Sequence, residues 1–381
     1  MELSKITAST ANPAGGEIIR DAKGRAVGAF LETAQGLLRA RSGLVTPEEA
    51  RARLRKETEL ASQECLARGV TTFHDAGASF STVDLYKTMA EEGTLPVRLY
   101  VMLSAGNEAL AERGAAYRMV GAVDNRLTVR AIKRLIDGAL GAHGAWLLEP
   151  YADLPASTGL NTESVEEMRA AAKFAIENGF QLATHAIGDR GNRETLNVYE
   201  EAFKAHPDKT DLRWRVEHAQ HLGADDIPRF GRLGVIPAMQ AIHCTSDGPW
   251  VFKRLGDKRA EEGAYVWRKL MDAGAVIANG TDVPVESIDP MACFYAAVTR
   301  KMKDGTPFFP DQKMTRAEAL RSYTVNGAYA GFEEALKGSL AAGKLADVTV
   351  LDRDILTCPE DEIPATRVLY TIIGGKVAYR R

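Results

Sequence analysis

Residues 127–138 read LTVRAIKRLIDG, a β-branched apolar run that ends in an aspartate and a glycine. A loop and an amphipathic segment follow this run, and the same order recurs along the chain. Short runs of this kind that alternate with helical patterns predict a parallel α/β sheet. The predicted strands cover residues 69–75, 97–103, 127–136, 181–186, 213–219, 235–240 and 275–281.

The segments between these runs carry helix signals. In residues 47–68, Ala50, Leu54, Ala61 and Cys65 recur at helical spacing, and Thr46 is a suitable N-cap residue. Comparable patterns predict helices over residues 162–178, 193–205, 260–273 and 316–324.

An open, doubly wound sheet normally carries a glycine-rich phosphate loop after its first strand. The only comparable run, Gly138, Gly141 and Gly144, has the wrong spacing and contains His143. A dinucleotide-dependent enzyme is therefore disfavoured, and a closed β/α barrel is the better interpretation. In such a barrel the active site lies at the carboxyl ends of the strands.

The predicted organisation has three parts: a hairpin-like segment over residues 1–45, the barrel over 46–335, and strands of a small β-sandwich over 336–381. Seven barrel strands are one short of the usual eight, and the tail strands are too few for an independent β-domain. Both shortfalls are explained if strand 1 and the first part of the sandwich are missing from the front of the chain. Because two barrel edges would then be unpaired, we expect a homo-oligomer, or covering of the gap by residues 1–31.

Composition excludes several classes of protein. The chain has 45% hydrophobic and 26% charged residues and a net charge of −3, which is ordinary for a globular protein and unlike a general nucleic-acid binder. The four cysteines form no CxxC pair, and no segment resembles a signal peptide or a membrane helix. These features predict a cytoplasmic protein whose partner is a small-molecule substrate, with neither nucleic acid nor membrane as a partner.

Four potential metal ligands stand at or near the ends of predicted strands: Lys133, His185, His218 and Asp282. Successive strand ends lie around one rim of a barrel, so these side chains can converge. Imidazoles with an oxygen ligand suit zinc and related divalent metals. A lysine becomes a comparable ligand only after carbamylation by CO₂. Each residue also has an ordinary alternative role, such as an ion-paired lysine or an aspartate in a turn.

Several phrases together resemble the amidohydrolase superfamily, and most closely its amidohydrolase-3 branch, which contains enzymes like N-substituted formamide deformylase. They occur in the family's order over essentially the whole chain. The phrases are GVTTFHDAG (69–77), IKRLIDGALGAHGAWLLEPYAD (132–153), ATHAIGDRGN (183–192), RVEHAQ (215–220), NGTDVPVESIDP (279–290) and GKLADVTVLDRDIL (343–356).

The resemblance implies a distorted (β/α)8 TIM barrel with a small β-sandwich and one or two divalent metals, usually zinc. It implies that Lys133 is carbamylated and bridges two metals, that His185 and His218 bind the second metal, and that Asp282 is the general base. The reaction would be hydrolysis of a C–N bond, in an amide- or formamide-like small molecule, by metal-activated water.

The chain departs from the family pattern at one point, because it contains no HxH motif. In the family that motif ends strand 1 and holds the first metal. The alternative is therefore a truncated, catalytically impaired protein that binds one metal weakly or none.

Three further histidines are candidate substrate-binding residues: His74, His143 and His243. His74 follows the first predicted strand and could also substitute as a metal ligand. His143 lies in the loop after residues 127–136, and His243 lies after residues 235–240. Loop hydrogen bonding is the ordinary alternative for such histidines.

Overall fold

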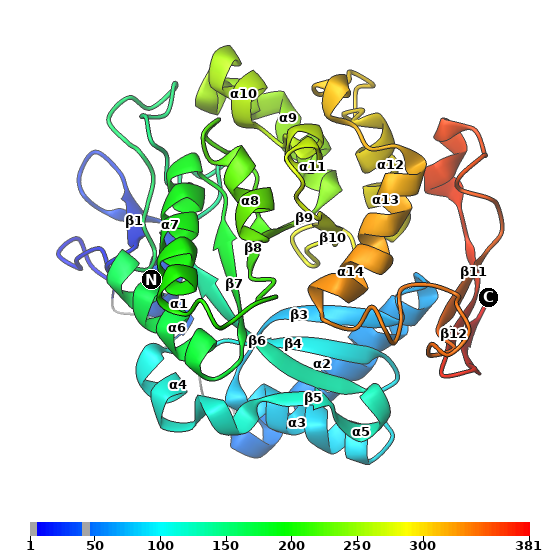
Figure 1. Ribbon diagram of the computed structural model, residues 1–381. Helices are drawn as coiled ribbons and strands as arrows, with labels where there is room; N and C mark the ends of the chain where they lie inside the picture. The colour runs from blue at the N-terminus through cyan, green and yellow to red at the C-terminus, as the bar shows by residue number, and fades with distance from the viewer. Residues whose placement is uncertain (1–5, 40–45) are drawn as a thin grey trace.

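The computed structural model describes residues 6–39 and 46–381. Its central feature is a curled parallel sheet surrounded by helices (Figure 1). From one end to the other, the sheet runs β10 (Ala278–Asn279), β9 (Ile236–Met239), β8 (Arg215–His218), β7 (Gln181–Ala186), β6 (Leu127–Leu135), β4 (Arg98–Leu103) and β3 (Thr72–Ala78). A short strand, β5 (Met119–Gly121), pairs antiparallel with β6.

All seven predicted parallel strands are present, which confirms the prediction of an α/β barrel-like fold. The sheet forms part of a barrel, because β3 and β10 stand at its two ends and do not pair with each other within the described ranges. The gap lies between the first and last parallel strands of the described ranges.

The inner face of the sheet is identified by a small buried cluster of Tyr100, Met102, Ala131 and Ala183. Alternate residues of a strand point to the same face. Lys133 and His185 lie two residues beyond Ala131 and Ala183, so they share the inner face and stand closer to the carboxyl ends of β6 and β7.

Helices pack around the outside of the sheet (Figure 1). The longer ones are α2 (Pro47–Ala67), α3 (Phe80–Glu91), α6 (Val165–Glu177), α7 (Asp189–Ala205), α9 (Ala241–Leu255), α12 (Pro290–Thr299) and α13 (Arg316–Tyr323). The shorter ones are α1 (Gly36–Arg39), α4 (Asn107–Arg113), α5 (Ala122–Asn125), α8 (Ile227–Leu233), α10 (Asp257–Gly263), α11 (Trp267–Asp272) and α14 (Val325–Ala330).

Capping residues explain where two of these helices begin. Thr46 caps α2 as predicted, and its side chain and that of Glu49 form a reciprocal capping box. Helix α6 begins at Val165, three residues later than predicted, because Ser164 is its cap.

The predicted helix over residues 260–273 is wrong in its continuity, since it is divided into α10 and α11. Ala264 pairs with His221 in a β-bridge, and Tyr265 has a φ of 53°. This non-helical backbone interrupts the hydrogen-bond ladder between the two helices.

Two small sheets accompany the barrel. Near the N-terminus, β1 (Gly16–Arg20) and β2 (Ala26–Glu32) form an antiparallel hairpin. Near the C-terminus, β11 (Val348–Leu351), β12 (Val368–Ile373) and β13 (Lys376–Arg380) form a separate antiparallel sheet. Arg98 of β4 joins the second sheet to the barrel, since its Nε and Nη2 lie 2.7 and 3.0 Å from the carboxylate oxygens of Asp347.

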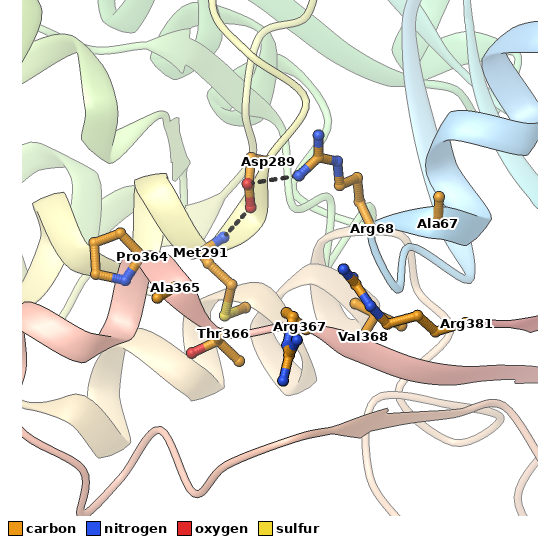
Figure 2. Close-up of a pocket in the computed structure, with 10 residues that line it drawn as sticks. All are labelled: Ala67, Arg68, Asp289, Met291, Pro364, Ala365, Thr366, Arg367, Val368 and Arg381. Atoms are coloured by element: carbon orange, nitrogen blue, oxygen red, sulfur yellow. Dashed lines mark hydrogen bonds and ion pairs between the residues drawn. The ribbon is translucent and has the colours of Figure 1, made fainter.

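A pocket lies between the end of α2 and the C-terminal sheet (Figure 2). Arg68 donates a hydrogen bond of 2.9 Å to Asp289, which also accepts one from the backbone N–H of Met291 at the start of α12. None of the predicted site residues lines this pocket. Over the described residues, every helix is too short or too polar to cross a membrane.

Candidate functional site

Side chains from several strands meet at the carboxyl edge of the sheet. The imidazole rings of His185 on β7 and His218 on β8 lie edge to face, with centroids 4.5 Å apart. His218 also belongs to a group with His243 and Asp282, whose potential ligand atoms all lie within 4.8 Å of one another. The structure therefore brings together the imidazoles and the carboxylate that the sequence places at separate strand ends.

The backbone at His218 and Asp282 is unusual, with φ angles of 76° and 60°. In the pairing of β7 with β8, Glu217 lies opposite His185 and therefore faces the inner side of the sheet. Strand alternation alone would turn the next side chain, that of His218, to the outer face. The positive φ at His218 departs from strand geometry, and its ring lies against His185. Such strain in non-glycine residues concentrates at functional sites.

A hydrogen bond of 2.7 Å between His218 Nδ1 and Gln240 Oε1 orients the His218 ring. The amide nitrogen of Gln240 donates to the carbonyl oxygen of Ala238, so its Oε1 faces the imidazole. An amide oxygen only accepts hydrogen bonds, which places the proton on Nδ1 and leaves a lone pair on Nε2. Burial lowers the pKa of His218 to about 4, so the ring is neutral at pH 7.

Asp137 stands behind His185, with its Oδ1 3.5 Å from His185 Nε2. The carboxylate is fully buried and accepts backbone N–H groups from Ile187, Gly188 and Trp146 at 3.0, 2.7 and 2.9 Å. Burial raises the pKa of Asp137 to about 7, although the three hydrogen bonds oppose this shift. The sequence analysis assigned Asp137 no role, and its position two residues after the end of β6 was the available signal.

His243, at the start of α9, forms an ion pair with Asp282. Its Nε2 lies 3.1 Å from Asp282 Oδ2, and its Nδ1 lies 3.7 Å from Glu286 Oε1. Burial would lower the pKa of His243, but the hydrogen bonds with Asp282 and Glu286 outweigh it and raise the pKa to about 9. An imidazolium offers no lone pair to a metal, and both ring nitrogens of His243 already face carboxylates, so its contact with substrate stays a prediction. Glu286 is a further carboxylate of the site that the sequence analysis did not single out.

Lys133 lies on the inner face of β6, with 7% of its surface exposed. Burial lowers the pKa of its amine, whereas the charges of Glu217 and Asp282 oppose that shift. Beside it, Arg215 and Glu217 of β8 form a buried ion pair of 2.7 Å.

The other two predicted substrate-binding histidines make contacts outside this group. The Nδ1 of His74 lies 3.0 Å from Arg215 Nη1, and its ring packs against Tyr100 on the inner face of the sheet. His143 has a φ of 58°, its Nε2 lies 3.1 Å from Asp153 Oδ1, and its ring packs against Tyr151. The structure does not join either histidine to the group of His218, His243 and Asp282, and their contact with substrate stays a prediction.

The donor set of the site fits a divalent metal. His185, His218 and Asp282 offer two imidazoles and a carboxylate, which is a combination that zinc accepts. Gln240 orients the His218 imidazole through a hydrogen bond, as outer partners of metal ligands commonly do, and the Asp137 carboxylate lies 3.5 Å from His185 Nε2.

Comparisons with known proteins agree with this chemistry. The sequence matches the profile of the amidohydrolase family over residues 1–379. Protein LONG AFTER FAR-RED 3 of Arabidopsis thaliana is 30% identical over 395 residues, which cover 100% of this chain and 66% of that protein. N-substituted formamide deformylase of Arthrobacter pascens is 28% identical over 385 residues, which cover 100% of this chain and 70% of that enzyme.

A crystal structure of an uncharacterized metal-dependent hydrolase of Pyrococcus horikoshii superposes with a TM-score of 0.76 and 27% identity. The match covers 94% of this chain and 69% of that one. The chain spans about two-thirds of the length of the curated relatives it matches. Since the family profile matches nearly every residue, the chain belongs to the amidohydrolase family, in the amidohydrolase-3 branch.

Proposed function

We propose that the chain hydrolyses a C–N bond of an amide- or formamide-like small molecule by means of a metal-activated water. The observation that carries this proposal is the position of His218, which lies against His185 and is grouped with Asp282, while Gln240 leaves its Nε2 free. Family membership supports a hydrolase, and the similar Pyrococcus structure supports a divalent metal. Zinc is the ion that this donor set suits best.

In this mechanism His185, His218 and Asp282 would hold the metal. When bound, the metal lowers the pKa of a water ligand and polarises the scissile carbonyl. Asp282 accepts the proton of the attacking water. Burial would raise its pKa, but the hydrogen bond from His243 outweighs burial, lowers the pKa and keeps the carboxylate ionised at neutral pH.

Two other side chains complete the proposed roles. Nε2–H of His243 donates to Asp282 Oδ2 at 3.1 Å and so holds the base in place. The buried amine of Lys133 has a lowered pKa, which favours the neutral form that reacts with CO₂. As a carbamate, Lys133 would supply one more oxygen ligand from β6.

A second candidate is a catalytically impaired protein that binds a single metal weakly or not at all. The observations that favour it are the absence of an HxH motif and the open sheet between β3 and β10 in the described ranges. Both candidates share His185 and His218 but differ in metal content and turnover.

Metal analysis tests the two candidates directly. Purified protein is loaded with zinc in bicarbonate, passed through a desalting column and analysed for metal and for hydrolysis of N-substituted formamides. Hydrolysis that depends on one or two bound ions per chain supports the proposal. One ion or none, without turnover, supports the second candidate. His218→Ala should reduce the metal content, whereas His206→Ala, at the end of α7, is the matched control.

A further inference from the structure

The N-terminal hairpin reaches the loop that follows β6. A Cβ on Gly15 would lie 2.7 Å from the Cα of Thr162, so the hairpin and that loop are in direct contact. Glu32, the last residue of β2, has a φ of 47° and a ψ of −124°. Residues other than glycine rarely adopt this conformation, and such strain persists where surrounding contacts enforce it.

The side chain of Glu32 rests on two glycines of the loop. A Cβ at Gly138 would collide with the Glu32 carboxylate, and one at Gly144 would lie 2.9 Å from Glu32 Oε1. The backbone N–H of Ala139 also forms a hydrogen bond with this carboxylate. The Glu32 side chain can therefore lie this close to the loop only because residues 138 and 144 are glycine. Gly141, the third glycine of the run, leaves room for the ring of Trp250 instead.

The loop beneath Glu32 is tightly closed and begins beside a residue of the site. Gly138 N–H donates to the Gly144 carbonyl at 3.1 Å, and Gly144 N–H donates to the Ala139 carbonyl at 2.9 Å. Gly138 directly follows Asp137, whose carboxylate lies 3.5 Å from His185 Nε2. A contiguous path of contacts therefore runs from Glu32 through the closed loop to Asp137 and His185.

The position of Glu32 has an electrostatic cost. Its half-buried carboxylate lies against Gly138, the residue next to the buried Asp137, and two neighbouring carboxylates repel each other. Glu32 therefore opposes stability in two ways. Its backbone is strained, and its carboxylate lies near the buried acid Asp137. Such a conflict between local and global structure is characteristic of functional positions.

We propose that Glu32 is a positioning residue of the hydrolytic site, which holds the loop after β6 and thereby fixes Asp137 and His185. This inference rests on the proposed function only in taking His185 as a metal ligand. It gives the N-terminal hairpin a role in assembling the site, although the hairpin lies about a hundred residues before β6 in the sequence.

The test combines Glu32→Ala and Gly138→Ala with their double variant. Gly138 does not have a positive φ, and the three atoms nearest to a Cβ there all belong to the Glu32 side chain. We expect each single variant to weaken zinc binding by about tenfold, the lower end of effects for outer partners of metal ligands. Because Glu32→Ala makes room for the new Cβ, the double variant should also lose about tenfold, whereas independent effects would multiply to about a hundredfold.

A metal-free readout separates this inference from the proposed function. In ¹⁵N-histidine spectra of the apoprotein, Glu32→Ala should shift the His185 resonances and leave those of His206 unchanged. Glu32→Gln, which keeps an oxygen acceptor for Ala139, should largely restore them. Glu17→Gln, at an exposed position of the same hairpin, is the matched control.

An unchanged His185 signal in Glu32→Ala, or a multiplicative double variant, would overturn the positioning role. If wild-type protein binds no zinc but the His185 signal responds to Glu32, the proposed function fails while the positioning role stands.

Discussion

Replacement of Gln240 by leucine tests how the fold prepares His218 for a metal. Gln240 accepts the Nδ1–H of His218 at 2.7 Å, and both side chains are buried. Leucine leaves this N–H without a partner in a buried site and no longer favours the tautomer with a free Nε2. Loss of such an outer partner weakens metal binding by about 10–100-fold, which corresponds to about 1.4–2.7 kcal/mol.

The assay is a competition titration of zinc against a chromophoric chelator, with circular dichroism of the metal-free protein as a check on folding. Gln240→Glu keeps an acceptor at the same place, so it should retain most of the affinity. Gln63→Leu changes an exposed glutamine of α2 to the same residue and should have no effect.

The reasoning fails if Gln240→Leu binds zinc as tightly as the wild type while His218→Ala loses binding. That pair of results would mean that the His218 ring needs no fixed tautomer. Equal losses in Gln240→Leu and Gln63→Leu would instead point to a general effect of added apolar surface.

Three further predictions concern catalysis, stability and pH. Asp282→Asn keeps an oxygen donor for the metal but removes the base, so it should abolish turnover and leave metal content largely unchanged by elemental analysis; retained turnover would exclude Asp282 as the base. Asp347→Ala should lower the free energy of unfolding in urea by about 3 kcal/mol, because it leaves the buried guanidinium of Arg98 without its carboxylate. The control is Glu201→Ala, which breaks the exposed pair with Arg169 and should cost less than about 1 kcal/mol. Equal losses of stability in the two variants would contradict the claim that burial makes the Arg98–Asp347 pair important. Burial would raise the pKa of Asp347, but its hydrogen bonds with Arg98 and the backbone outweigh burial and lower it. The contribution of the pair is therefore complete above about pH 4 and is lost as the pH falls below that value, so the stability difference between Asp347→Ala and wild type should shrink in acid.

Much of the fold and part of the site could be predicted from local patterns. Seven strands were placed because β-branched runs and helical periods are properties of short segments. The approach of His218 to His185 and to Asp282 agrees with the rule that the carboxyl ends of parallel strands share one edge. The division of residues 260–273 into two helices did not follow, since it depends on a β-bridge between Ala264 and the distant His221.

The sequence by itself therefore determined which candidate residues stand at or near the ends of strands. Only the tertiary structure decided which groups support them. Gln240, Asp137 and Glu32 reach the site through loop and hairpin contacts that have no period along the chain. Periodicity reports burial within one element, whereas these contacts depend on how separate elements pack against one another.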